Sequence, residues 1–101
     1  MTEDFGKAVM LNDRGVFVVY LDAKQRYSVL TIVQGNVVLG DDIAGPMSDW
    51  GPKKVFNIAS GRSVLVIVEE SDCGLARATD LVRKIKMPDR VTYLQGHPVG
   101  P

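Results

Sequence analysis

Short runs of β-branched and aromatic residues alternate with turns rich in Gly, Asn and Asp through the first two thirds of this chain. There are about five or six such runs, roughly ten residues apart, which is the spacing of short strands joined by tight turns. β-Branched and aromatic side chains fit a pleated sheet, and Gly, Asn and Asp tolerate the positive φ that turns need. We therefore expect a mainly β fold, a small antiparallel barrel or sandwich.

The clearest pair of strands is a hairpin near the start of the chain. Residues 7–11 and 16–21 are predicted to pair across the turn Asn12-Asp13-Arg14-Gly15. Further strands are expected over residues 27–33, 37–39, 43–44, 53–58 and 62–69, with a Gly- and Pro-rich loop over 45–52. The middle of the last of these strands is apolar at every position, so we place it at the centre of the sheet.

After residue 70 the apolar spacing changes from two to about 3.6, which predicts a helix over residues 72–86. Ser71 or Asp72 is suited to cap its start, and Pro88 to stop it. Several strands are apolar on both faces, so the helix must either plug one end of the barrel or lie across an open face. We expect residues 1–95 to form one domain of OB-like barrel plus helix, with a last short strand over 91–95 and a flexible tail over 96–101.

The charge of the chain is balanced, with 12 Lys and Arg against 12 Asp and Glu. A domain that grips phosphates usually carries an excess of basic residues. Neutrality therefore weighs against a nucleic-acid partner, although it leaves room for a local basic patch.

Cys73 is the only cysteine, so no intramolecular disulfide can form, which is typical of a reducing compartment. The N-terminus has neither the basic start nor the apolar core of a signal peptide. The longest apolar run, residues 64–68, is too short for a membrane-spanning helix. We expect a cytoplasmic protein.

Two short motifs carry a resemblance to a known family. Residues 6–15 (Gly-x-Ala-x-x-Leu-Asn-x-Arg-Gly) resemble the start of cold-shock-type OB-fold domains, where a Gly-x-Val start leads through a strand to Asn and a Lys-Gly turn. Residues 40–42 (Gly-Asp-Asp) are similar to the Gly-Asp corner of OB and S1-type barrels. The resemblance implies an OB-like barrel of five to six strands that binds single-stranded nucleic acid. The wider pattern also resembles small bacterial proteins without an assigned function.

The chain departs from this family where the family binds its ligand. Cold-shock domains stack bases on aromatic residues of two adjacent strands. At the corresponding positions this chain has Met10 on the first strand and the aliphatic Val16 and Val18 on the second. The resemblance thus implies the fold more than the stacking surface.

The nearest combination of aromatic and basic residues surrounds the turn at residues 22–26. Its tyrosines and cations, joined by two later lysines, could contact a nucleic-acid strand. The candidate contacts are Tyr20, Lys24, Arg26, Tyr27, Lys53 and Lys54. The alternative is a solvated hairpin end whose tyrosines pack at the rim of the barrel.

Met47 and Trp50 lie in the Gly- and Pro-rich loop and are candidate partner contacts. A tryptophan on such a loop either folds back as a lid over the barrel mouth or forms an exposed anchor for a partner.

No catalytic, cofactor or metal site is expected. Cys73 and His97 are far apart in sequence and have neither the spacing of zinc ligands nor that of a nucleophile with its base. The chain also lacks phosphate-binding and dinucleotide-binding Gly motifs and a nucleophile elbow.

These observations lead to two hypotheses. The first is a non-enzymatic module that binds single-stranded RNA or DNA weakly. The alternative is a protein–protein interaction or homodimerisation domain, because the strands have more apolar faces than one helix can cover. A small ligand in the barrel mouth is a third class, for which the sequence offers no convergent polar set.

Overall fold

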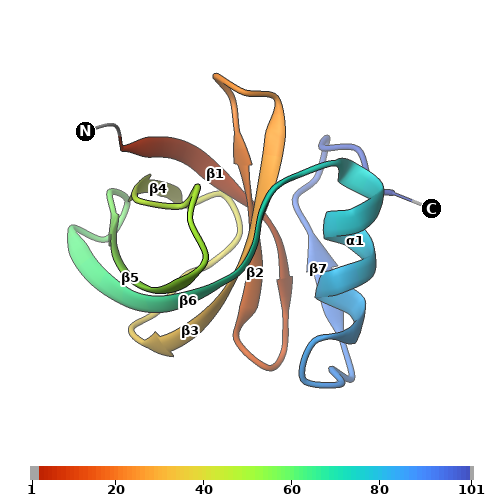
Figure 1. Cartoon of the computed structure of the whole chain (residues 1–101). Helices are drawn as coiled ribbons and strands as arrows, with labels where there is room; N and C mark the ends of the chain where they lie inside the picture. The colour runs from red at the N-terminus through yellow and green to blue at the C-terminus, as the bar shows by residue number, and fades with distance from the viewer. Residues whose placement is uncertain (1–2, 101) are drawn as a thin grey trace.

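Strands whose side chains alternate between the inside and the outside close into a six-stranded antiparallel barrel, with a seventh strand outside it (Figure 1). The structure, a computed structural model, describes residues 3–100. The elements are β1 (Asp4–Asn12), β2 (Val16–Leu21), β3 (Arg26–Gln34), β4 (Asp42–Gly45), β5 (Gly51–Asn57), β6 (Arg62–Cys73), α1 (Leu75–Lys84) and β7 (Val91–Tyr93). The mainly β barrel with one C-terminal helix that the sequence predicts is confirmed.

The strand order around the barrel is β1-β2-β3-β6-β5-β4, and β4 pairs back to β1. β1 divides its second edge between two neighbours. Its first half pairs with β4, as Phe5 does with Ala44, and its second half pairs with β7, as Met10 does with Tyr93. This division closes the barrel and leaves β7 outside it.

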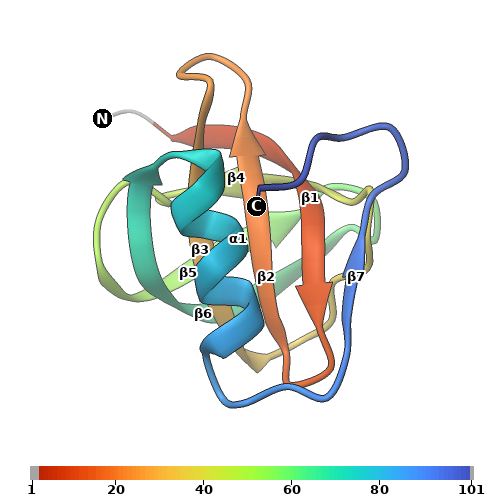
Figure 2. The ribbon, with the colours of Figure 1, turned by 90° about the vertical axis from the view of Figure 1, so that its right-hand side faces the viewer.

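The β-sheet of the barrel has an apolar layer on its inner face and another on its outer face, which explains why several strands are apolar on both faces. The interior is filled by side chains such as Phe17, Leu30 and Val66. On the outer face of the barrel, Ala78 and Val82 of the helix pack against five apolar side chains of the sheet: Val9, Met10, Val16, Val18 and Val29. Of the two predicted placements, α1 takes the second and lies across the outer face of the barrel (Figure 2).

The predicted helix, residues 72–86, is too long at both ends. β6 continues through Cys73, which pairs with Tyr27 of β3, so sheet pairing holds the residues that were expected to open the helix. Gly74 is the N-cap and has no side-chain cap hydrogen bond, so neither Ser71 nor Asp72 caps the helix. Ile85 is the C-cap.

Three further predictions need correction. Residues 37–39 are not a strand: the N–H of Val38 bonds to the carboxylate of Asp41 within the loop, and Val37 is buried in the barrel core. The loop over 45–52 is shorter, since β4 includes Gly45 and β5 begins at Gly51. The last strand is Val91–Tyr93 rather than 91–95.

The segment expected as a flexible tail lies against the barrel and the helix as far as it is described. The His97 ring contacts Tyr27, and the N–H of Gly100 donates a hydrogen bond of 2.9 Å to Oγ1 of Thr79. Residue 101 lies outside the described residues.

Candidate functional site

Tyr20 and Tyr27, the predicted stacking residues, pack on each other and on His97. The ring centroids of Tyr20 lie 5.1 Å from those of both Tyr27 and His97, and the Tyr27 hydroxyl lies 2.8 Å from Nε2 of His97. Tyr27 is buried. Burial raises the pKa of Tyr27, and the neighbouring Tyr20 raises it further. Burial lowers the pKa of His97, although the negative charge of Asp22 opposes this shift. The tyrosine rings therefore pack against the C-terminal segment and do not form an open surface on which bases could stack.

The predicted cations beside these tyrosines are engaged within the fold. Lys24 Nζ lies 3.3 Å from a carboxylate oxygen of Asp4 and hydrogen bonds to Ser48. Burial would raise the pKa of Asp4, but hydrogen bonds from Ser48, the Met47 N–H and Lys24 outweigh it and lower that pKa. Both charges of the Lys24–Asp4 pair are therefore held in place.

Arg26 is engaged in the same way. It donates a hydrogen bond of 2.7 Å to the carbonyl of Asp72, and its Nε lies 3.5 Å from the Asp72 carboxylate. The structure brings Tyr20, Lys24, Arg26 and Tyr27 to one region, as predicted, but neutralises or covers most of their binding groups.

Met47 and Trp50, the two residues predicted to contact a partner, differ in their exposure to solvent. Met47 is fully buried in the barrel core, and its carbonyl accepts a hydrogen bond from Ser28, so it offers no surface to a partner. Trp50 is 68% exposed and directly precedes β5, so it does not fold back as a lid.

Lys53 and Lys54 lie on β5, separate from the tyrosines. Neither forms a salt bridge within residues 3–100, and the same holds for Arg62 at the start of β6. Arg62 was not among the predicted contacts, because nothing in the sequence shows that it lacks an acidic partner.

β5 and the adjoining parts of β3 and β6 lie on the side of the barrel away from α1 (Figure 1), and several of their side chains form an exposed apolar wall. We define it as the outward-facing residues Val33, Phe56, Leu65 and Ile67, which are between 37% and 61% exposed. They come from β3, β5 and β6, which are neighbours in the sheet. The even-numbered β6 residues Val64, Val66 and Val68 fill the interior, so the odd-numbered ones face outward. This wall is the apolar excess that the sequence indicated.

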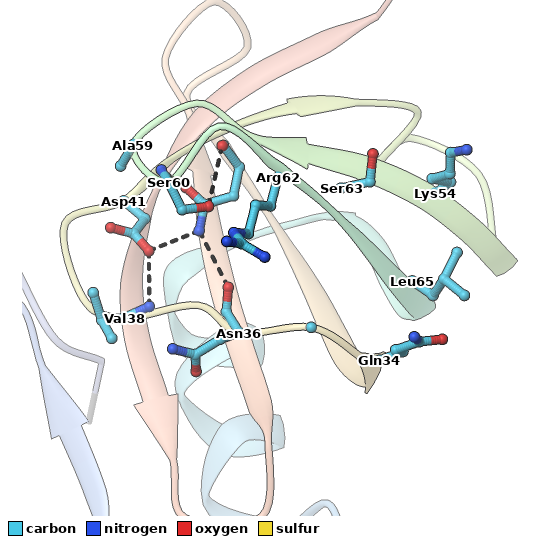
Figure 3. Close-up of a pocket in the computed structure, with 12 residues that line it drawn as sticks. Gln34, Asn36, Val38, Asp41, Lys54, Ala59, Ser60, Arg62, Ser63 and Leu65 are labelled. Carbon is cyan, nitrogen blue, oxygen red and sulfur yellow. Dashed lines mark hydrogen bonds between the residues drawn. The ribbon is translucent and has the colours of Figure 1, made fainter.

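A groove of about 850 Å³ borders the wall (Figure 3), within the size range of protein ligand sites. The loop that follows β3 forms one side of the groove, and the β5–β6 hairpin with the adjoining strands forms the other side. The lining residues are Gln34, Gly35, Asn36, Val38, Asp41, Lys54, Asn57, Ala59, Ser60, Arg62, Ser63 and Leu65.

Asn57 links the two sides of the groove through hydrogen bonds. Its side-chain amide donates to the carbonyl of Asn36 and to Oδ2 of Asp41, at 3.2 and 2.8 Å. The same Asp41 oxygen accepts the N–H of Val38 at 2.9 Å. These bonds hold the groove in shape without a ligand.

The residues with catalytic chemistry do not converge. Cys73 is buried and donates to the carbonyl of Tyr27, and burial, with the charge of Glu70, raises the pKa of its thiol. Within residues 3–100, no three His, Cys, Asp or Glu side chains are grouped to hold a metal ion. None of the helices described is long and apolar enough to cross a membrane.

Comparisons with known proteins place the chain in no family. No protein-family model, no curated protein and no solved structure matches it. The wall, the groove and the cations beside them are therefore the features of the molecule that bear on its function.

Proposed function

We propose that this protein is a non-enzymatic interaction module that self-associates through the exposed apolar wall. The observation that carries the proposal is that four exposed apolar side chains lie on the outer face of three neighbouring strands, with Pro52 opposite Ile67. Contiguous apolar surface edged by polar residues is typical of protein interfaces, whereas single exposed apolar residues are common on any surface.

A second copy is the partner that the charges favour. Lys54 lies beside Leu65 in the β5–β6 register, and the exposed Glu69 follows Ile67 along β6. In a two-fold dimer each copy presents the same patch, so a patch bearing one cation and one carboxylate complements itself. With a formal net charge of zero, two copies also approach without net repulsion.

Sedimentation velocity over a range of about 5 to 500 µM tests this proposal, because self-association depends on concentration. We expect the mass to rise from 11.0 kDa toward twice that value. Ile67→Lys and Phe56→Lys should hold the protein monomeric. Met87→Lys is the matched control, since Met87 is 84% exposed and lies beyond the helix, outside the wall. A monomer at every concentration, or equal effects of all three variants, would overturn the proposal.

Weak binding of single-stranded nucleic acid is the second candidate. It is supported by Lys54 and the exposed ring of Phe56, which lie two residues apart on the outer face of β5. Lys53 lies on the other face of the strand, opposite Val66, and neither lysine forms a salt bridge within residues 3–100. The antiparallel barrel is consistent with the cold-shock-type resemblance, which we retain as part of this candidate. A cation and an aromatic ring side by side can hold a phosphate and stack a base.

Fluorescence anisotropy with labelled 20-residue oligo(dT) and oligo(U), at about 50 mM salt where phosphate contacts are strongest, tests this candidate. The double variant K53A/K54A should weaken binding, while K24A/R26A should not, because Lys24 and Arg26 are ion-paired. Absence of binding at micromolar protein, or greater sensitivity to K24A/R26A, would contradict it.

A further inference from the structure

The groove beside the wall contains a stretch of strand with a free edge. β6 begins at Arg62 and pairs with β5 from that residue, which lies opposite Asn57. On its other side, β6 finds its first partner only at Leu65, opposite Gln34, the last residue of β3. Gly35 then packs against Val64, so only Arg62 and Ser63 have no neighbouring segment of strand on the side of the groove.

The charges around this edge favour an anionic ligand. Lys54 and Arg62 line the groove and form no salt bridge within residues 3–100. The one carboxylate among the lining residues is that of Asp41, and it already accepts bonds from Asn57 and Val38. Arginine presents a planar fork of donors that matches a carboxylate.

The remaining lining residues distinguish a peptide from a nucleic acid. None of the twelve residues that line the groove is aromatic, so it offers no ring on which a base could stack. Its apolar members Val38 and Leu65 can pack against an aliphatic side chain. Its amides and hydroxyls, such as those of Asn36 and Ser63, suit a peptide backbone.

We propose that this groove binds an extended acidic segment of a partner protein, whose backbone pairs with the open edge at Arg62 and Ser63. Backbone hydrogen bonds to a free edge supply affinity, and pockets for alternate side chains supply specificity. Carboxylates of the segment pair with Arg62 and Lys54, and an apolar residue contacts Leu65. The site does not need self-association, but it shares Leu65 with the wall and Lys54 with the charges proposed for the dimer, so the peptide and a second copy would compete for these two residues.

The probe is an eight-residue peptide that alternates Glu and Val, acetylated and amidated, titrated into the ¹⁵N-labelled full chain. We expect shifts in the amide resonances of residues 62–65 and at least about fivefold weaker binding when salt rises from 50 to 300 mM. The same peptide with Lys in place of Glu should not bind. A peptide methylated on alternate backbone nitrogens should also fail, because it cannot complete the strand pairing.

Protein variants separate this site from general charge attraction and from the wall. Arg62→Ala should weaken the Glu–Val peptide at least about fivefold, as expected for a lost charge-assisted hydrogen bond. Arg90→Ala removes the same charge on the exposed segment before β7, and should change nothing. Ile67→Lys should abolish self-association while keeping peptide binding. No shift at millimolar peptide, equal binding of the methylated peptide, or binding of oligo(dT) at these residues instead would each overturn the proposal.

Discussion

The side-chain amide of Asn12 donates hydrogen bonds to the main-chain carbonyls of Val82 and Ile85, at 3.0 and 3.2 Å, across about two thirds of the chain. Its carbonyl oxygen accepts the N–H groups of Arg14 and Val16, at 2.8 and 3.0 Å. Asn12 is buried, and it serves both the turn of the first hairpin and the free carbonyls at the end of α1. One residue thus fixes the helix to the barrel.

Asn12→Ala should lower the free energy of unfolding by about 3 kcal/mol, because it leaves several buried backbone groups without partners at about 1–3 kcal/mol each. Asn12→Asp keeps the acceptor for the turn but directs a negative charge at the carbonyls of α1. We expect a larger loss at pH 7, since the C-terminus of a helix is the negative end of its dipole.

The two variants respond differently to acid. A carboxyl at position 12 is favoured in its neutral form in the folded state, so Asn12→Asp should recover stability relative to wild type as the pH falls toward 4.5. Urea unfolding at pH 7 and 4.5 measures this, with Asn12→Ala as the control that does not titrate. A constant difference between Asn12→Asp and wild type would show that the amide does not face these carbonyls.

The same residue shows how far the sequence predicts the fold. The turn after Asn12 was predicted because Asn and Asp tolerate the backbone conformations of turns and bond to nearby backbone groups, and because Gly15 supplies positive φ. The structure shows these local bonds, to the N–H groups of Arg14 and Val16. Its bonds to Val82 and Ile85 depend on where the helix docks, which no local pattern determines. The helix start was misplaced for a similar reason, because Cys73 is held in β6 by pairing with Tyr27.

The candidate site was harder to predict than the fold. Tyr20 and Tyr27 are close in sequence to Lys24 and Arg26, and the structure keeps them together. The groups that occupy or cover them come from distant segments and have no sequence signal. The apolar wall did have a sequence signal, since residues 64–68 are apolar on both faces. Sequence alone could not show which face α1 leaves open.

Acid should weaken the fold through His97. Burial lowers the pKa of this imidazole below its ordinary value of 6.5, so the folded state favours the neutral ring. The stabilisation is complete above pH 6.5 and is lost as the pH falls through the folded pKa. The free energy of unfolding of wild type should therefore decrease between pH 7.5 and 5.5, and that of His97→Gln should decrease less.

His97 is the only histidine, so its ring resonances report this pKa directly by NMR. A titration midpoint at or above 6.5, or parallel pH profiles for wild type and His97→Gln, would contradict the burial of this ring.

Gly100→Ala should release the C-terminal segment. A Cβ at this position would lie 2.7 Å from Oγ1 of Thr79 and 3.0 Å from Cα of Ala76, and the N–H of Gly100 would lose its bond to Thr79. We expect a loss of about 1 kcal/mol, as for one hydrogen bond, together with a rise of the His97 pKa toward 6.5 as its ring becomes solvated. Val99→Ala is the control, and an unchanged His97 pKa in Gly100→Ala would show that the two contacts are independent.

Cys73 should react slowly while the protein is folded. Burial raises the pKa of its thiol, and the charge of Glu70 adds to this against the opposing charges of Arg26 and Arg77. Alkylation requires the thiolate, so iodoacetamide at pH 8 should modify the native chain at least about 100-fold more slowly than the chain in urea. Glu70→Gln removes one cause of the raised pKa without uncovering the sulfur, and should accelerate the native reaction modestly while leaving the rate in urea unchanged. Equal rates for the native and unfolded chains would mean that Cys73 is open to solvent and that the junction between β6 and α1 does not close over it.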